Sequence, residues 1–439
     1  MTLSDGDAAS VATPLPASLP IPPATGGDDL PEVGPRYIWL MTLAQFGVFV
    51  AFITPIAISL SIRLEDLAPG RDEYLGYIIG AGAFAVVLTG PFAGILSDRT
   101  RTRLGRRRPF MIGGTLLGIG ALVFMAQAPN VLSLGAAWVL MQLTWGTVLG
   151  NLQISTADRL PESQRGKVAG LTGFATQVAP VLGVGLAGLV SGNDLLLFLV
   201  PGAVGVVAVA LFVVFVPEAD SRLLDLGERL TVGRLLRKFV FDPRRYPDYA
   251  CNWLGRFLFY FGLSLNTTFT AFFIASRLEI SVEEVAGIIA AVALGGILAT
   301  TVGALGGGFL SDRLRRRRVF VLLAGVLFGA GAITMAFAPG LPLIIPGSLL
   351  SSVGIGMFAA VDQALLLDVL PERETDAGRF MSIIGFAVSI PQAVAPLIAP
   401  IFLAVGAAGG EKNYTLLYLV AGVFTVLGGL VVLRIRSVR

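Results

Sequence analysis

Gly94-Ile-Leu-Ser-Asp98-Arg99 is the stretch that decides the fold, because it recurs as Gly308-Phe-Leu-Ser-Asp312-Arg313 in the second half of the chain. Each copy ends an apolar run and is followed by a series of arginines. Two further pairs repeat in the same order, at offsets between 210 and 214 residues: Asp158-Arg-Leu-Pro161-Glu162 with Asp368-Val-Leu-Pro371-Glu372, and Gly173-Phe-Ala with Gly385-Phe-Ala. The chain of 439 residues therefore contains an internal duplication.

Composition places both copies in a lipid bilayer. Apolar residues make up 55% of the chain and charged residues 14%, whereas a soluble domain carries about 25% charged residues. A helix that crosses the roughly 30 Å hydrocarbon core needs about 20 mostly apolar residues. Runs of that kind predict an all-α integral membrane protein with twelve transmembrane helices in two pseudo-symmetric six-helix bundles, at 37–60, 73–96, 109–128, 132–156, 167–190, 194–216, 249–275, 283–309, 319–338, 341–367, 378–405 and 413–434.

The duplication predicts four parts of the chain. Residues 1–36 are rich in proline and acidic residues and have no apolar run, which predicts a disordered cytoplasmic tail. The first bundle is expected over 37–216 and the second over 249–439, joined by a basic cytoplasmic loop at 217–248. Six spans in each half give both halves the same orientation in the membrane.

The distribution of Lys and Arg predicts the orientation. If the N-terminus is cytoplasmic, 27 of the 32 Lys and Arg residues lie on the cytoplasmic side, four lie on the other side and Arg256 lies within a span. An excess of Lys and Arg marks cytoplasmic loops. We therefore expect a multi-pass protein of the cell (inner) membrane with both termini in the cytoplasm.

Several classes of protein conflict with the composition. The chain has no histidine and one cysteine, Cys251, which excludes an intrachain disulfide, a His-Glu-x-x-His zinc hydrolase and a histidine proton relay. The basic residues are spread over the loops between spans, which argues against a nucleic-acid partner. Asp362 and Asp368 lie six residues apart on one predicted helix and face different directions, unlike a two-carboxylate intramembrane protease. The sequence predicts no metal site, no cofactor and no enzymatic activity.

Two ionisable residues lie well inside predicted spans. Arg256 is in the span 249–275 and Asp362 is in the span 341–367, each roughly 10 Å from the cytoplasmic end at 1.5 Å per residue. An unpaired charge at mid-membrane costs at least about 2.5–3.5 kcal/mol, so such groups pair or face a wet cavity. We expect Arg256 and Asp362 to meet. The pair could couple transport to a proton or serve as a permanent structural contact.

The duplicated loops carry a family resemblance. Gly94-x-x-x-Asp98-Arg99 followed by Gly105-Arg-Arg resembles the signature loop of the major facilitator superfamily. The long spacing to Gly105 and the segment Ala360-Val-Asp362-Gln363-Ala are similar to those of sucrose/proton symporters and glycoside–pentoside–hexuronide cation symporters. The resemblance implies a monomeric secondary transporter that moves a small polar solute, a sugar or glycoside, by alternating access with proton coupling. Sodium coupling is not expected, because the first, second and fourth spans lack a mid-depth acidic residue.

The resemblance also implies where the substrate binds, since the first, fourth, seventh and tenth spans line a central cavity in this superfamily. Amide, hydroxyl and aromatic side chains on those spans suit a hydroxyl-rich ligand, although any single aromatic residue could instead pack between helices. The expected cavity residues are Gln45, Phe52, Gln142, Trp145, Gln153, Tyr260, Asn266, Phe358 and Gln363, beside the proton-coupling residues Asp362 and Arg256.

The duplicated loops predict a cytoplasmic gate. Asp98 and Asp312 end spans that lie beside the eleventh and fifth spans in this superfamily, and a carboxylate is favoured near a helix N-terminus. These contacts would hold the cytoplasmic side shut in the outward-facing state. The alternative is that the arginine runs only set topology. The expected gate residues are Gly94, Asp98, Arg99, Arg165, Gly308, Asp312, Arg313 and Arg379.

A second transport activity stays open. Proton-coupled exporters of drugs and metabolites carry a glycine- and proline-rich motif in the fifth span, and this chain retains part of it in Gly173, Pro180 and Gly183. The motif's paired glycines are missing here. An antiporter therefore remains the alternative to a symporter.

Overall fold

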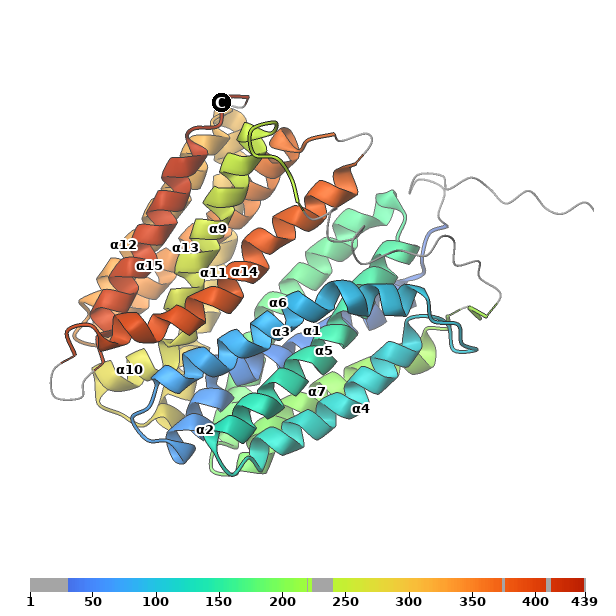
Figure 1. Cartoon of the computed structure of the whole chain (residues 1–439), viewed down its shortest axis with the longest axis horizontal. Coiled ribbons are helices and arrows are strands. Elements are labelled where there is room, and N and C mark those ends of the chain that lie inside the picture. Colours follow the sequence, from blue (N-terminus) through green and yellow to red (C-terminus); the bar gives the residue numbers. More distant parts are fainter. Residues whose placement is uncertain (1–30, 219, 223–239, 373–375, 408–411, 438–439) are drawn as a thin grey trace, which may run out of the picture.

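The computed structural model describes residues 31–218, 220–222, 240–372, 376–407 and 412–437. The first half forms one bundle of helices (Figure 1). Its elements are α1 (Pro35–Thr54), a π-helical turn η2 (Pro55–Ser59), α2 (Leu60–Leu67), α3 (Glu73–Asp98), α4 (Arg108–Ala126), α5 (Val131–Arg159), α6 (Glu162–Leu189) and α7 (Asp194–Phe215).

The second half forms a second bundle. Its elements are α9 (Pro247–Thr268), α10 (Thr270–Leu278), α11 (Val282–Leu314), α12 (Arg317–Ala336), α13 (Leu341–Val369), α14 (Ala377–Ala404) and α15 (Tyr414–Val432). α9 and α10 meet at a bend of 47° next to Phe269.

The predicted all-helical membrane fold is confirmed. Within the described residues, eleven helical segments are long and apolar enough to cross a bilayer, and the bent pair α9–α10 supplies a twelfth. The first span continues through η2 and α2 to Leu67, seven residues beyond the predicted end. This last part carries the charged residues Arg63, Glu65 and Asp66. Because the prediction followed the apolar run, it did not include this polar extension of the helix.

Short local signals start several helices. Asn130 and Ser133 form a capping box at the start of α5, and Ser281 and Glu284 form one at the start of α11. Each box satisfies backbone amides that have no partner in the first turn of a helix. Pro35 begins α1, where a missing amide hydrogen costs nothing. These signals place the helix starts at the membrane surfaces.

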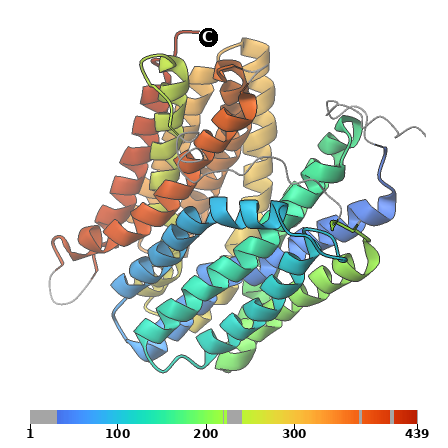
Figure 2. The same ribbon diagram turned by 45° about the vertical axis from the view of Figure 1, so that its right-hand side comes forward.

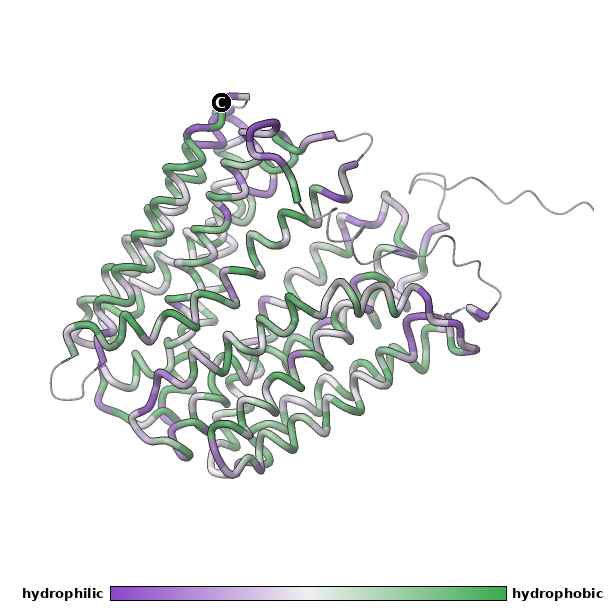
Figure 3. Tube along the Cα trace, in the orientation of Figure 1, coloured by the Kyte–Doolittle hydropathy of each residue, from purple (hydrophilic) through white to green (hydrophobic). Residues whose placement is uncertain are grey.

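The two bundles contact each other at one end and diverge at the other (Figures 1 and 2). We call the end where α1 begins and α15 ends the open side, and the end where α3 begins and α15 begins the closed side. Hydrophilic residues gather at both ends, whereas the helices between them are mostly hydrophobic (Figure 3). α3 packs on α14 and α6 packs on α11, and these two pairs make the main contacts between the bundles.

Glycines on α3 permit the close contact near the closed side. A Cβ atom added to Gly76 would lie 2.3 Å from the carbonyl oxygen of Pro396, and one added to Gly80 would lie 2.4 Å from Cγ of Leu397. Any side chain at either position would push α14 away from α3. These two residues therefore determine how closely the bundles approach.

Candidate functional site

Arg256 and Asp362 form an ion pair inside the second bundle. Nη2 of Arg256 lies 2.5 Å from Oδ2 of Asp362, and Nε donates to the same oxygen at 2.6 Å. Asn252 donates to the other carboxylate oxygen at 2.9 Å, and Arg256 also donates to Oε1 of Gln363 at 3.4 Å. Arg256 is 8% exposed and Asp362 is 1% exposed. The two ionisable residues of the spans are thus in contact, and two amides extend the pair into a network.

The helices place this pair at similar depths. Arg256 lies about 14 Å along α9 from its start at Pro247, and Asp362 lies about 10 Å from the end of α13 at Val369, at 1.5 Å per residue. Asn252 and Arg256 are four residues apart and therefore share one face of α9. Because α9 and α13 belong to the same bundle, the pair does not bridge the two halves.

Aromatic rings separate the ion pair from the middle of the membrane. Phe358, one helical turn before Asp362, stacks on Phe259 with ring centroids 3.6 Å apart. Tyr260 meets the edge of Phe358 at 6.0 Å and 82°. Phe259 and Phe358 are almost fully buried, whereas Tyr260 is partly exposed. Phe259 and Phe358 belong to the hydrophobic core of the second bundle, so the ion pair lies next to that core.

A cavity of about 340 Å³ lies between the two bundles near the middle of the spans. Its apolar wall consists of Phe52, Ile53, Ile56, Ile79, Ala83, Val86, Val87, Leu263 and Pro396. Its polar residues are Gln142, Ser264, Thr267, Thr268, Ser389 and Gln392. No charged side chain is among these described lining residues. The volume and the mixed wall are typical of a small-molecule site.

A smaller cavity of about 150 Å³ adjoins the central one between α3 and α5. The two cavities share Val86 and Gln142. Gly90, Gly146 and Gly150 widen the smaller one toward the open side. The central cavity therefore continues along α5 in the direction in which the bundles diverge.

The structure distributes the expected cavity residues over three environments. Phe52 and Gln142 line the central cavity, while Tyr260, Phe358 and Gln363 surround the ion pair. The remaining four residues do not line the central cavity. Trp145 is fully buried against Gly118, Asn266 is 7% exposed within α9, Gln45 hydrogen-bonds Thr156 at 3.5 Å, and Gln153 is exposed on α5.

Two polar residues of α14 were missed by sequence reasoning. Ser389 and Gln392 both line the cavity, but they lie on the eleventh span, which the family resemblance does not place at the cavity. Gln392 is exposed in the middle of a membrane helix. A polar side chain in the middle of a membrane span faces the protein interior or a wet cavity, so the glutamine within the apolar span 378–405 was the signal in the sequence that could have revealed it.

On the open side, three of the expected gate residues, Asp312, Arg165 and Arg379, contact residues of their own half of the chain. Asp312 lies 2.9 Å from Arg317, which also lies 2.5 Å from Asp368. Arg379 pairs with Asp376 at 3.2 Å and donates to the Val240 carbonyl, and Arg165 donates to the Leu160 carbonyl at 3.3 Å. Arg99 and Arg313 lie at the ends of α3 and α11. A Cβ atom on Gly308 would only touch Ala360, at 3.9 Å. The side-chain surroundings of Gly94 and Asp98 lie outside the described part of the structure.

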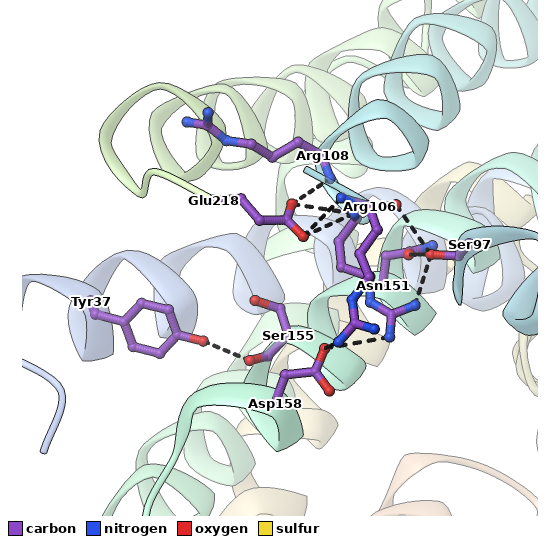
Figure 4. A network of polar contacts seen from close by, with 9 residues as sticks. Tyr37, Ser97, Arg106, Arg108, Asn151, Ser155, Asp158 and Glu218 are labelled. Carbon is purple, nitrogen blue, oxygen red and sulfur yellow. Dashed lines mark hydrogen bonds and ion pairs between the residues drawn. The ribbon is translucent and has the colours of Figure 1, made fainter. Parts of the chain in front are cut away.

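Matching arginine–aspartate contacts anchor both copies of the duplicated loop. Asp158 accepts from Arg106 at 3.2 Å and Arg107 at 3.4 Å (Figure 4). Its counterpart Asp368 pairs with Arg317, the counterpart of Arg107. In the first bundle, Glu218 also accepts the three backbone amides at the start of α4, from Arg106 to Arg108, at 3.0–3.2 Å. These contacts fasten each bundle internally.

Contacts on the closed side join the bundles. Nζ of Lys412 lies 2.5 Å from Oε2 of Glu73, and the hydroxyl of Tyr414 donates to Asp72. Burial raises the pKa of Asp72, although the Tyr414 hydrogen bond and the Lys412 charge partly oppose it. In the sequence, Lys412 is one of the four basic residues predicted to lie on the outer side of the membrane. It lies 339 residues from Glu73, so no local pattern could have predicted their contact.

A family model described as Major Facilitator Superfamily matches residues 38–305 and 252–439. The chain belongs to the major facilitator superfamily. It is therefore a multi-pass membrane transporter rather than an enzyme, and transporters of this superfamily typically act as monomers on small molecules. Its fold resembles the nucleoside transporter NupG, with a TM-score of 0.70 and 13% identity over 92% of this chain and 99% of that one. A bacterial homologue of the human lysosomal transporter Spinster gives 0.67 and 17% identity, over 92% and 99% of the two chains.

Curated relatives in the superfamily differ in what their names say they transport. The General alpha-glucoside permease of Schizosaccharomyces pombe is 34% identical over 110 residues, which is 24% of this chain and only 18% of that protein. Multidrug resistance protein 2 of Bacillus subtilis is 23% identical over 65% of this chain and 70% of its own length. The Quinolone resistance protein NorA of Staphylococcus aureus is 24% identical over 82% and 92%.

Proposed function

We propose that this chain carries a small neutral polar solute, a sugar or glycoside, across the cell (inner) membrane by alternating access coupled to protons. The main support is the central cavity, whose described lining combines polar side chains from both bundles with an apolar wall and no charge. The buried ion pair of Arg256 and Asp362 lies in the second bundle and is not part of this lining. Solute and proton would therefore occupy neighbouring but separate sites.

The positive-inside rule supports a cytoplasmic location for both termini, since 27 of 32 Lys and Arg residues would then lie inside. The open side is then the cytoplasmic side. In this orientation the structure is the inward-facing state, with the two bundles in contact at the outer surface through α3 and α14.

The coupling step would take place at the ion pair. Asp362 accepts a proton in the outward-facing state, which removes the charge that holds Arg256. Arg256 keeps Gln363 as a neutral partner, so the guanidinium is not left bare. A single added proton thereby replaces a salt bridge by neutral hydrogen bonds, and this alters the packing of α9 against α13.

Closing the cytoplasmic side would use the duplicated loops. When the bundles approach there, Asp98 would meet the N-terminus of α14 with Arg379, and Asp312 would meet the N-terminus of α6 with Arg165. The helix pairs that this requires, α3 with α14 and α6 with α11, are already neighbours. Opening requires the arginines to return to partners within their own bundles, as with Arg379 and Asp376.

Purified protein in proteoliposomes tests the proposal. Counterflow with a panel of radiolabelled glycosides and sugars identifies the solute, and an inward proton gradient should then drive its accumulation. Asp362→Asn should abolish accumulation and retain counterflow. Asp220→Asn removes an exposed carboxylate far from the pair and should behave as the wild type. Proton-driven accumulation by Asp362→Asn would refute the coupling role.

Export of drugs or metabolites is the second candidate. It is favoured by the likeness to NorA and to Multidrug resistance protein 2, which covers far more of the chain than the likeness to the glucoside permease. The largely apolar wall of the cavity also suits such solutes. Proton-driven efflux of dyes or quinolones from loaded vesicles, without counterflow of any sugar, would establish export instead.

A further inference from the structure

Two carboxamides face the central cavity from opposite bundles, Gln142 on α5 and Gln392 on α14. Their contacts with α3 show that they lie at similar depths in the membrane. A Cβ atom on Gly80 would lie 2.8 Å from the carbonyl oxygen of Ala393, the residue after Gln392, and a Cβ atom on Gly82 would lie 2.9 Å from Cγ of Gln142. Two residues of α-helix rise about 3 Å. Gln142 and the backbone next to Gln392 therefore lie at depths within about one helical turn of each other, on opposite sides of the cavity.

Three of the four hydroxyl groups that line the cavity, all except that of Ser264, are already used as donors. Thr267, Thr268 and Ser389 each donate to the carbonyl four residues earlier in their own helix, at 2.7–3.2 Å. They can offer only oxygen lone pairs to a solute. Gln142 and Gln392 make no hydrogen bond with the described residues, and each carries two N–H donors and one acceptor. The two glutamines are thus the main source of donors for a bound solute.

We propose that Gln142 and Gln392 are the specificity-determining pair of this transporter, and that they select a neutral solute with neighbouring hydroxyl groups on one face and an apolar surface on the other. This inference rests on the proposed function and names its substrate class. A glycoside with an apolar aglycone has that chemistry: its hydroxyls engage the carboxamides and the hydroxyl oxygens, and its apolar part lies against Phe52 and Ile79. A charged solute would find no counter-charge among the described lining residues, and a purely apolar one would leave both carboxamides unpaired.

Because the pair spans the two bundles, a solute held by both glutamines links them. A solute that contacts only one of the two glutamines makes no contact that favours closure of the other bundle. Selection is therefore expected in both affinity and turnover, with the affinity effect dominant because both contacts exist in the bound state.

Transport kinetics test the pair. For a glycoside that the wild type exchanges, Gln392→Ala and Gln142→Ala should each raise KM roughly tenfold, the effect of one lost hydrogen-bonding partner. Gln392→Asn should lie between these variants and the wild type. Gln392→Glu should lose the neutral glycoside and gain an amine-bearing analogue. Gln127→Ala, which alters an exposed glutamine at the end of α4, should match the wild type. Wild-type KM and selectivity in the glutamine variants would overturn the inference, whereas absence of glycoside exchange by the wild type would overturn the proposed function.

A labelling experiment does not depend on turnover. Cys251 is the only cysteine, so Cys251→Ser gives a background without thiols. In that background Gln392→Cys should react with a charged, water-soluble thiol reagent, and the transported glycoside should slow the reaction. Val423→Cys, an exposed apolar position in the middle of α15, should not react. An inert Gln392→Cys, or one that the transported glycoside leaves unprotected, would contradict the proposal.

Discussion

Lys412 and Glu73 connect the two bundles across the closed side, with 2.5 Å between Nζ and Oε2. Lys412 precedes α15 in the second bundle, and Glu73 begins α3 in the first. The hydroxyl of Tyr414 reaches Asp72 beside them. These contacts must break whenever the closed side opens.

Lys412→Ala should favour the state in which the closed side is open. A partly exposed ion pair contributes about 0.2–1 kcal/mol, which corresponds to a change of up to roughly fivefold in the ratio of the two states. The rate of thiol labelling at Thr268→Cys from the closed side, in the Cys251→Ser background, measures this ratio. The double variant Lys412→Glu with Glu73→Lys should restore the wild-type rate, and failure to restore it would argue against a direct ion pair.

Asp72 should cause acid to stabilise the closed contact. Burial raises its pKa when the side is closed, whereas an exposed aspartate has a value near about 3.9. The closed contact therefore binds a proton more strongly than the open one. Protonation of Asp72 therefore stabilises the closed contact. This stabilisation is complete at a pH below the ordinary pKa of an aspartate and is lost as the pH rises through the raised pKa of Asp72.

Labelling of Thr268→Cys from the closed side should consequently slow as the pH falls through this range. Asp72→Asn should remove the part of that dependence that exceeds the titration of the thiol itself, because the amide cannot titrate. Lys412, Tyr414 and Glu73 face the same carboxylate and remain in this variant. An unchanged pH profile in Asp72→Asn would assign the sensitivity to another group.

Breaking the buried ion pair from one side should destabilise the protein more than removing it altogether. Arg256→Gln leaves Asp362 buried without its cation, and such changes cost about 3–5 kcal/mol. The double variant Arg256→Gln with Asp362→Asn should recover most of that loss but transport without proton coupling. Thermal unfolding in detergent measures the first effect and proteoliposome uptake the second. A double variant no more stable than Arg256→Gln would contradict this account.

Glu218→Ala should loosen the start of α4. Its carboxylate accepts three successive backbone amides there and favours the positive end of the helix. Losing a helix cap costs about 1 kcal/mol, so the midpoint of thermal unfolding should fall by a few degrees. Glu279→Ala, an exposed acidic residue after α10, provides the comparison and should leave the midpoint unchanged.

Gly76→Val should prevent the closed side from closing, because the first atom of any side chain would lie 2.3 Å from the Pro396 carbonyl oxygen. Labelling of Thr268→Cys from the closed side should become fast, and exchange should stop. Gly113→Val places the same side chain on α4, where an added Cβ meets no atom within 4 Å, and should transport normally. Normal exchange by Gly76→Val would show that α14 can shift.

The fold was predictable because hydropathy and the duplication are long, repeated signals. The ion pair was predictable for a related reason, since Arg256 and Asp362 stand out within apolar spans. The cavity was harder to predict, because Gln392 and Ser389 are neutral and lie on a span that the family resemblance did not mark. Trp145 is the opposite case, because it was expected in the cavity and is instead fully buried. It follows Gln142 by three residues, but Gly118 makes room for its ring in the core of the first bundle.

The ion pair sits wholly within one bundle, and if Asp362 takes up the coupling proton as proposed, this location has a consequence for the response to voltage. When the bundles rock as rigid bodies, Arg256 and Asp362 travel together and sum to zero charge. The transition of the unprotonated carrier therefore moves no net charge of this pair through the electric field. Once Asp362 holds a proton, the same motion carries one net positive charge, worth about 2.3 kcal/mol per 100 mV if it crosses the whole membrane. At this site, the membrane potential would thus act on the protonated carrier and not on the unprotonated one.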